Sequence, residues 1–344
     1  MTIRSYTDND RAAWDAYVMG SGDSACYHLA GWKDVVEKSF GHGTWYLLSE
    51  NDEKQINGIL PLVQIKSALF GNYVVSMPFF NYGGVCADNN RVRAELLASA
   101  VTCATRLHAG HIELRHQLPM DQGWQVKTSK VSMVLNLPRR HDELWSSFPS
   151  KLRNQVQRPV KDGMFARLGR EDSLDDFYSI FSVNMRDLGT PVYSKEFFRN
   201  ILRAFPRSTW ICTVCTDSRR PVAAGFLVAF KERLEIPWAS SLRQYNRHSP
   251  NMLLYWSVLK LACDRGYRAF DFGRSTPDEG AYRFKEQWGA QPVPLYWHYW
   301  MNKKQAMPEL NPHNPRFRMA IDLWKRLPVG LTNLIGPAIV KNLP

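Results

Sequence analysis

The chain has 344 residues, 44% of them hydrophobic, which is enough material for two domains of ordinary size with packed cores. This composition excludes an intrinsically disordered chain. The formal net charge of +12 and the pI near 9.4 predict a basic surface. Such a surface attracts polyanions such as RNA, anionic lipid headgroups or nucleotide-linked sugars without choosing among them, and many basic proteins bind none of these.

The sequence carries no visible targeting or metal-binding signal. Its N-terminus, MTIRSYTDNDRAAW, lacks an apolar h-region, and its longest apolar stretches are far shorter than the roughly 20 residues that cross a bilayer. Among six cysteines only Cys212 and Cys215 are close, and in a strand-like segment they point to opposite faces. We therefore expect a soluble, cytoplasmic protein with free, mostly buried thiols and no metal site.

The first half of the chain reads as a strand, two helices, three strands, a helix and a strand. Hydrophobic periodicity and Asn, Asp and Gly turns place these elements at residues 2–7, 8–20, 28–40, 43–50, 55–67, 72–80, 91–110 and 111–116.

The second half repeats this order and adds a last strand. Its elements are expected at residues 163–169, 173–189, 194–205, 208–217, 220–232, 233–241, 249–267, 268–273 and 292–300. The order is that of the N-acetyltransferase (GNAT) fold, in which the fourth and fifth strands splay apart and leave a cleft. We therefore predict a mixed α/β tandem of two GNAT-like domains, 1–148 and 149–304.

Two segments of the chain are basic, one at the start of the second predicted domain and one after its end. Residues 150–170 carry Lys151, Arg153 and Arg158 among six cations, and this segment is either a solvated helix face or a surface that contacts phosphates. The tail, 305–344, is basic and amphipathic, so it either packs on its own domain or lies on an anionic membrane surface.

The stretch DFGRSTPDEGAYRFKEQWGA, residues 271–290, concentrates charge and aromatic rings after a buried strand. Its DFG is not accompanied by the other kinase motifs, and the chain has no phosphate loop, dinucleotide fingerprint, serine elbow or HExxH. The glycines that hold the pyrophosphate of acyl-CoA in GNAT enzymes are also missing, because LRQYNRHSPN stands at that position. A standard CoA site is therefore not expected.

Several motifs together resemble the FemAB family of aminoacyl-tRNA-dependent acyltransferases over nearly the whole chain. They are KLRNQVQRPVKDGM, MRDLGTPVY, AAGFLVAF, YWSVLKLACDRGYRAFDFGRS and, most specifically, GRS followed by YRFKEQWGA. LFGNYVVSMPFFNYGGV and EIPWASSLRQYN make the chain more similar to the FemAB-related proteins associated with exosortase/PEP-CTERM exopolysaccharide systems.

The resemblance implies a double GNAT fold and transfer of an amino acid from tRNA to an amine of a peptidoglycan precursor, without CoA. It also implies that Lys285, the lysine of the family's F-K motif, is needed for catalysis. One departure is Arg158-Pro159, where the family has Lys-Ala, and proline is expected to interrupt a helix there.

Residue chemistry leaves four roles open for Lys285. A cation can stabilise the oxyanion that forms when an amine attacks an ester, which is our first choice. The alternatives are neutralisation of the tRNA 3′ end, a general base with a depressed pKa, and a surface lysine paired with Glu279 or Glu286.

Each remaining candidate residue of this stretch has either a functional or a structural role. Asp271 either orients Arg274 or Lys285 or caps the strand, and Arg274 and Ser275 either bind acceptor phosphate or form a turn. Tyr282 is expected on one strand face with Phe284 and Trp288, for core packing or ring stacking.

Two further candidates lie elsewhere in the chain. Asn81 and Tyr82 precede two glycines that permit either close approach of a ligand or a β-bulge. Arg186 is a candidate for an acidic group of the acceptor.

Three functions compete. The first is FemAB-like transfer from aminoacyl-tRNA to a sugar- or lipid-linked precursor, with no bound cofactor. The second is acyl-CoA-dependent N-acyl transfer on the same fold. The third is a non-catalytic RNA- or polysaccharide-binding protein. The sequence leaves the transferred group, the acceptor and the oligomeric state open.

Overall fold

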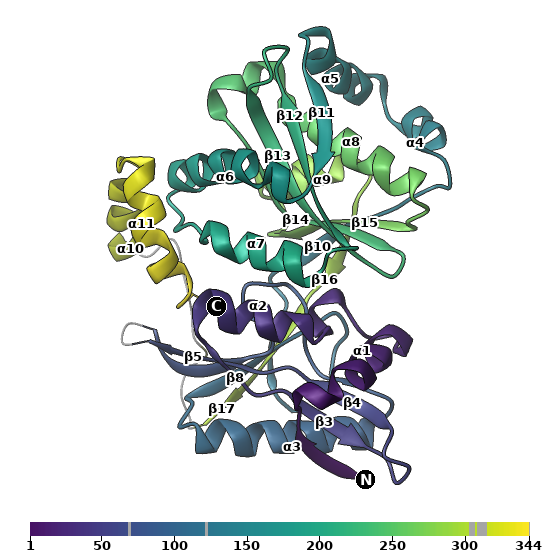
Figure 1. Cartoon of the computed structure of the whole chain (residues 1–344), viewed down its shortest axis with the longest axis vertical. Helices are drawn as coiled ribbons and strands as arrows, with labels where there is room; N and C mark the ends of the chain where they lie inside the picture. Colours follow the sequence, from purple (N-terminus) through teal and green to yellow (C-terminus); the bar gives the residue numbers. More distant parts are fainter. Residues whose placement is uncertain (68–69, 121–122, 303–306, 308–314, 344) are drawn as a thin grey trace. The chain divides into compact units, whose positions relative to one another are not determined.

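The computed structural model describes residues 1–67, 70–120, 123–302, 307 and 315–343 (Figure 1). The chain forms two compact units. Unit 1 comprises residues 1–131, 293–309 and 341–344, and unit 2 comprises residues 132–292 and 310–340. The limits differ from the expected 1–148 and 149–304, because a strand from the end of the second half pairs in a sheet of unit 1.

Unit 1 contains two sheets. The first has the order β1 (Thr2–Ser5), β3 (Leu47–Glu50), β4 (Ile56–Leu60) and β7 (Cys86–Ala87). The second has the order β2 (Gly43–Thr44), β5 (Val63–Ser67), β6 (Gly71–Val75), β8 (His111–His116), β17 (Tyr296–Met301) and β9 (Gln125–Lys127). Its helices are α1 (Arg11–Gly20), α2 (Gly31–Phe40) and α3 (Asn90–Arg106).

Three of the expected strands are broken. One of them, 292–300, divides into β16 (Gln291–Pro294) and β17, which lie in different sheets. The segment 43–50 divides into β2 and β3, and 55–67 divides into β4 and β5, with the halves in different sheets. Pro61 stands between β4 and β5, and because proline has no N–H it cannot continue the ladder.

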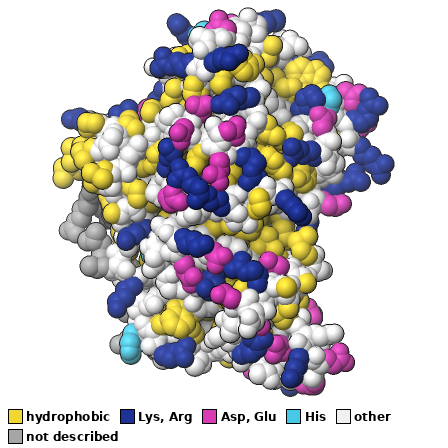
Figure 2. Space-filling view, in the orientation of Figure 1, with side chains coloured by type: hydrophobic (Ala, Val, Ile, Leu, Met, Phe, Trp, Pro, Cys, Tyr) yellow, Lys and Arg dark blue, Asp and Glu magenta, His cyan; other side chains and the backbone are white. Residues whose placement is uncertain are grey.

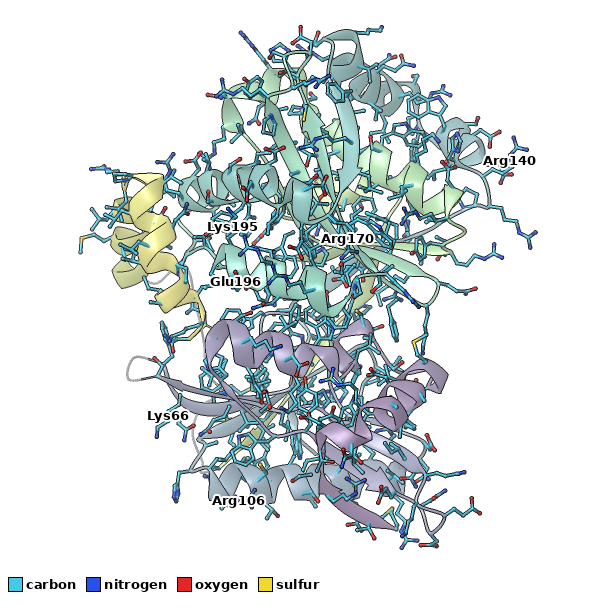
Figure 3. The ribbon with its side chains drawn as sticks, viewed as in Figure 1. Lys66, Arg106, Arg140, Arg170, Lys195 and Glu196 are labelled. Carbon is cyan, nitrogen blue, oxygen red and sulfur yellow. The ribbon has the colours of Figure 1, made fainter. Side chains whose placement is uncertain are left out.

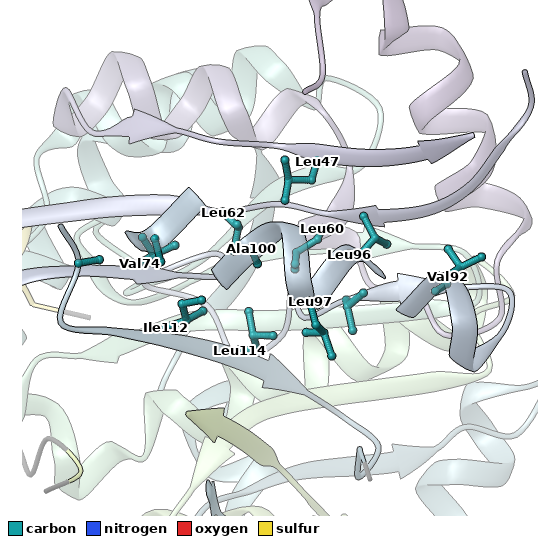
Figure 4. Close-up of a cluster of buried hydrophobic side chains, with 14 residues drawn as sticks. Leu47, Leu60, Leu62, Val74, Val92, Leu96, Leu97, Ala100, Ile112 and Leu114 are labelled. Atoms are coloured by element: carbon teal, nitrogen blue, oxygen red, sulfur yellow. The ribbon is translucent and has the colours of Figure 1, made fainter. Parts of the chain in front are cut away.

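The core of unit 1 forms where α3 packs against β3 and β4. Figure 4 shows the buried leucines, valines and alanines of this cluster, including Leu60, Leu96 and Leu97. At Gly58 an added Cβ would lie 2.5 Å from Val92 and 2.9 Å from Leu96, so the helix sits directly on the strand backbone.

Unit 2 is built on one seven-stranded sheet. Its order is β11 (Phe165–Gly169), β12 (Thr209–Cys215), β13 (Pro221–Phe230), β14 (Arg233–Ser241), β15 (Ala269–Ser275), β10 (Val131–Asn136) and β16 (Gln291–Pro294). The helices are α4 (His141–Ser147), α5 (Ser150–Lys161), α6 (Leu174–Leu188), α7 (Lys195–Ala204), α8 (Pro250–Asp264), α9 (Gly280–Glu286), α10 (Pro315–Trp324) and α11 (Val329–Val340).

Helices cover both faces of this sheet. Phe226 of β13 contacts rings of α6 and α7, Phe177 and Phe198. A Cβ on the preceding Gly225 would lie 3.6 Å from Leu254 of α8. Since successive strand residues point to opposite faces, α6 and α7 lie on one side and α8 on the other.

Each unit contains one pair of parallel strands that separates after a few residues. In unit 2, β14 and β15 pair from Arg233↔Ala269 to Glu235↔Asp271 and no further. In unit 1, β6 and β8 pair at Val74↔Ile112 and Val75↔Glu113. The expected splay of the fourth and fifth strands is therefore present in both units.

Two local expectations are wrong. Pro159 does not interrupt the helix at that point: it is buried in the last turn of α5, which ends two residues later at Lys161. The segment of Tyr282, Phe284 and Lys285 forms the helix α9 rather than a strand.

The six cysteines are free and buried, as predicted. Within the part of the chain that the structure describes, no helix combines the length and apolar character needed to cross a membrane.

Candidate active site

Lys285 lies where β14 and β15 separate. Its side chain reaches from α9 to β15, and Nζ donates hydrogen bonds to the carbonyl oxygens of Gly273 and Arg274, each at 2.9 Å. Both carbonyls follow Asp271, the last residue that β15 pairs with β14. Lys285 is only 8% exposed, so the alternative of a surface lysine paired with an acid of its own helix is wrong.

Burial controls the charge of this amine. Burial is the main reason that the pKa of Lys285 falls to about 8. The charge of Asp271 opposes this shift, Arg274 lowers the pKa further, and Glu235 raises it. An ammonium group has three donors, and two are committed to backbone carbonyls. The third has no acceptor among the described residues. At neutral pH the group is therefore mostly a cation with one N–H left for an oxygen atom.

Asp271 positions this part of β15. Its carboxylate is fully buried, and Oδ1 accepts hydrogen bonds from Ser132 Oγ at 2.6 Å and from the N–H of Gly273 at 2.8 Å. Oδ2 lies 3.6 Å from Nη1 of Arg233. Gly273 has a φ of 76°, which favours glycine, and its carbonyl is one of the two that hold Lys285. Asp271 thus fixes the turn that carries the lysine's acceptors.

Three other predicted residues surround this point with different exposure. Ser275 is buried, and its hydroxyl has no hydrogen-bond partner within the described part of the chain. Arg274 is exposed and Tyr282 is half-buried on α9. Among the described residues, Ser275 therefore leaves a buried hydroxyl without a partner near Lys285, and Arg274 is a solvent-exposed cation.

Two aromatic residues of this segment pack in the core. Phe284 of α9 and Trp288, two residues after the end of α9, are four positions apart and pack against Tyr255 of α8, with ring centroids at 5.0 and 6.2 Å. Tyr282 does not share this face. Core packing accounts for Phe284 and Trp288, but the shared strand face predicted for all three is wrong.

The cations of the basic segment 150–170 fall into two groups. Lys151, Arg153 and Arg158 lie on α5 and form no ion pair with any residue that the structure describes, while Leu152 and Val156 bury the opposite side of the helix. These three cations are available to an anionic partner.

The other arginines of this segment have structural partners. Arg170, labelled in Figure 3, donates to the carbonyls of Leu202 and Thr209 at 2.6 and 3.0 Å. Arg167 pairs with Asp176.

Arg186 is also engaged. Its Nε donates to Asp187 at 2.6 Å, and Nη1 donates to the carbonyl of Leu327 at 3.1 Å, so it joins the end of α6 to the tail. The structure does not bring it to Lys285.

Asn81 and Tyr82 lie in unit 1, where Tyr82 lines a pocket of about 240 Å³ and Asn81 is half-buried outside the lining. The N–H groups of Gly83 and Gly84 both donate to the carbonyl of Arg115, at 3.1 and 2.8 Å. The two glycines therefore shape this pocket without offering their amides to a ligand.

Sequence reasoning missed the charged residues that accompany these features. Glu235 and Arg233 were seen only as part of a strand, although Glu235 stands directly opposite Asp271. Arg115 was hidden in HIELRH in the same way. The available signal was a charged residue inside an otherwise apolar strand, which is expensive to bury without a partner.

The loop before α8 lacks the amides of a CoA site. It forms a short 3-10 helix, Arg243–His248, and α8 begins at Pro250, which has no N–H. The N–H of Met252 is donated to the Ser249 carbonyl at 2.9 Å. A pyrophosphate would therefore find few free donors at this helix N-terminus.

Comparisons with known proteins agree with this architecture. Residues 146–286 match the family model described as acetyltransferase (GNAT) domain. A curated relative, the UDP-N-acetylmuramoylpentapeptide-lysine N(6)-alanyltransferase of Weissella viridescens, is 22% identical over 162 residues, 45% of this chain. The chain spans about half the length of this relative, 48%.

Solved structures show the same fold over most of the chain. The crystal structure of FemX has a TM-score of 0.66 at 16% identity and covers 86% of this chain and 97% of its own. A tandem GNAT protein from the clavulanic acid biosynthesis pathway has a TM-score of 0.57 at 12% identity. The match covers 89% of this chain and 99% of that protein's chain.

Fold and comparisons together define the fold class: the chain has a tandem GNAT-like fold, and residues 146–286 match an acetyltransferase (GNAT) domain. The proteins that it resembles include the alanyltransferase and FemX named above.

Proposed function

We propose that this protein is a FemAB-like aminoacyltransferase that moves an aminoacyl group from aminoacyl-tRNA to an amine of a cell-envelope or exopolysaccharide precursor. The amine nitrogen bonds to the ester carbonyl carbon, the bond from that carbon to the tRNA ribose oxygen breaks, and the amine's proton passes to the departing hydroxyl. The observation that carries the proposal is the buried ammonium of Lys285, which has one uncommitted N–H where β14 and β15 separate.

Two features support tRNA over CoA as the donor. The exposed cations of α5 suit a phosphate backbone. The helix start that would hold a CoA pyrophosphate begins with proline. The relative from Weissella viridescens, whose name specifies alanyl transfer to a lysine, supports an amine as the acceptor.

The finer assignment is to the FemAB-related proteins of exosortase/PEP-CTERM systems, on the motif resemblance alone. The motifs of this group do not define an acceptor. We propose a sugar- or lipid-linked exopolysaccharide precursor as the acceptor, and a cytoplasmic protein at the inner face of the membrane.

Incubation with charged tRNAs and candidate precursors, followed by mass spectrometry, tests the proposal. A precursor heavier by one aminoacyl residue, formed only with charged tRNA, supports it. A product formed from acyl-CoA instead would favour the second candidate, since the matched family model describes acetyltransferases. Binding of RNA or polysaccharide without any product would favour a non-catalytic protein.

The pH dependence of transfer separates an ammonium from a general base. If protonated Lys285 stabilises the oxyanion, kcat should fall as the pH rises through about 8, the pKa of this amine. A general base would give the opposite slope. The acceptor amine titrates as well, so the profile is compared with that of Lys285→Arg, whose guanidinium keeps its charge. A decline that persists in Lys285→Arg would contradict the assignment.

We further propose that the tail touches an anionic membrane. Trp324 is buried and Ile321 half-buried, and Ile321 packs near Gly189. The outer side leaves large apolar residues exposed, which gather over α10 and α11 in Figure 2. They are Met319, Leu323, Leu331 and Leu334, beside Arg318, Lys325 and Arg326.

The double variant Leu323→Glu/Leu334→Glu should reduce binding to phosphatidylglycerol-containing vesicles at least about tenfold. It removes apolar area that the membrane would bury, and its carboxylates are repelled by the anionic lipids. Co-sedimentation measures the bound fraction. Met19→Glu changes another exposed apolar residue, in α1, and should have no effect. Equal loss in both variants, or no binding by the wild type, would refute the membrane contact.

A further inference from the structure

The pocket of unit 1 lies at the same topological point as Lys285 in unit 2. It opens where β6 and β8 separate, because its lining combines Tyr82 and Val85, from the segment after β6, with Arg115 and His116 at the end of β8. Crevices at the carboxyl ends of diverging parallel strands are where α/β sheets bind ligands. The last paired residue of the fifth strand is a buried carboxylate in both units, Glu113 here and Asp271 in unit 2.

Arg115 is a buried cation with donors to spare. It is 1% exposed; Nε donates to Glu113 at 2.7 Å and Nη1 donates to the Phe80 carbonyl at 2.5 Å. Its guanidinium lies over the ring of Trp297, 4.3 Å from the centroid, which holds it in place. Nη2 has no hydrogen-bond partner within the described residues. Leaving a buried charged donor without an acceptor is costly, so a ligand or water oxygen is expected there.

His116 adds a polar wall without a charge. Its Nε2 accepts the N–H of Val85 at 2.9 Å, so the neutral ring carries its proton on Nδ1, beside the carbonyl of Leu114. Burial lowers the pKa of His116 well below its usual value. Gly84 makes room for this ring, since a Cβ there would lie 2.3 Å from it.

The lining sets the charge and size of the ligand. Arg93 pairs with Asp23 and Arg115 pairs with Glu113, so the two cations are balanced by two acids. The attraction for an anion comes from the unpartnered Nη2 of Arg115 and not from a net charge. This balance suits one negative charge better than the two of a phosphate. Val85, Leu118 and Met120 add apolar walls around a volume suited to a small molecule or to one end of a larger one.

We propose that the pocket of unit 1 is a binding site for a monocarboxylate with a small apolar body, whose carboxylate accepts a hydrogen bond from Nη2 of Arg115. This binding proposal does not depend on whether the protein transfers aminoacyl groups, so it is tested by measuring binding and not turnover.

Ligand-observed NMR with propionate and its uncharged isostere propionamide tests this site on the full chain. Propionate should bind with a roughly millimolar dissociation constant, as expected for so small a ligand, and propionamide about tenfold more weakly or not at all. Arg115→Lys keeps the positive charge beside Glu113 but removes the Nη2 donor of the guanidinium. It should weaken propionate binding about tenfold.

Leu118→Trp provides a second variant that leaves the buried ion pair intact. Leu118 is 59% exposed, so a larger side chain there should narrow the pocket without unfolding unit 1, and propionate binding should fall. Equal binding of propionate and propionamide would overturn the proposal. Absence of propionate binding by the wild type would also overturn it. So would propionate binding that is unchanged both in Leu118→Trp and in a folded Arg115→Lys.

Discussion

Replacing Lys285 by methionine is expected to lower kcat for aminoacyl transfer by about 10²–10³-fold, the usual cost of removing one oxyanion donor. Methionine keeps most of the apolar stem but has no N–H for the developing oxyanion. The KM for the acceptor should change little, since the lost interaction forms in the transition state. Steady-state kinetics with charged tRNA measure both constants.

Arg283→Met is the matched control, because it removes an exposed cation from the same helix, two residues away. It should leave kcat within about threefold of the wild type, as an exposed charge outside the site contributes little. Circular dichroism and thermal unfolding check that both variants fold. Full activity of a folded Lys285→Met would remove Lys285 from the mechanism and favour a non-catalytic role for this position.

Arg115→Met should destabilise the protein by about 3–5 kcal/mol, because it leaves the carboxylate of Glu113 buried without its cation. Glu113 is 4% exposed, and besides its pairing with Arg115 it accepts a hydrogen bond from the hydroxyl of Tyr299 at 2.8 Å. Urea unfolding of the full chain at neutral pH measures the free energy. This loss would be among the largest for any single substitution in unit 1.

A second substitution separates the ion pair from simple packing. Arg115→Met/Glu113→Gln removes the stranded charge while an amide keeps a partner for Tyr299, so the double variant should be more stable than Arg115→Met alone. If the double variant is as unstable as the sum of both single variants, the two residues do not interact and the ion pair contributes nothing to stability.

Elements with a strong local pattern were predictable to the residue. The alternation of HIELRH and RLEIPWASS placed β8 and β14 with the bounds that the structure has. The hydrophobic pattern of a strand depends only on its own side chains and the face they bury, so neighbours in space are not needed to find it.

The segment around Lys285 was predicted wrongly for the opposite reason. Tyr282, Phe284 and Trp288 stand at even spacing, which strands favour, but Phe284 and Trp288 are also four apart, which helices favour. Packing of both rings on Tyr255 decides for the helix. Similarly, one continuous strand over 55–67 fits the pattern, and only the divergence of two sheets at Pro61 divides it.

The sequence alone determined the tandem order of elements and the buried thiols, because each depends on local pattern or on residue identity. Through family resemblance it also led to the prediction that Lys285 is needed for catalysis. Only the tertiary structure decided that two backbone carbonyls hold the lysine's ammonium, that Asp271 fixes those carbonyls, and that Arg115 and His116 line a pocket in unit 1. Those contacts join strands and loops far apart along the chain, and the desolvation that sets the pKa of Lys285 arises only when these segments pack together.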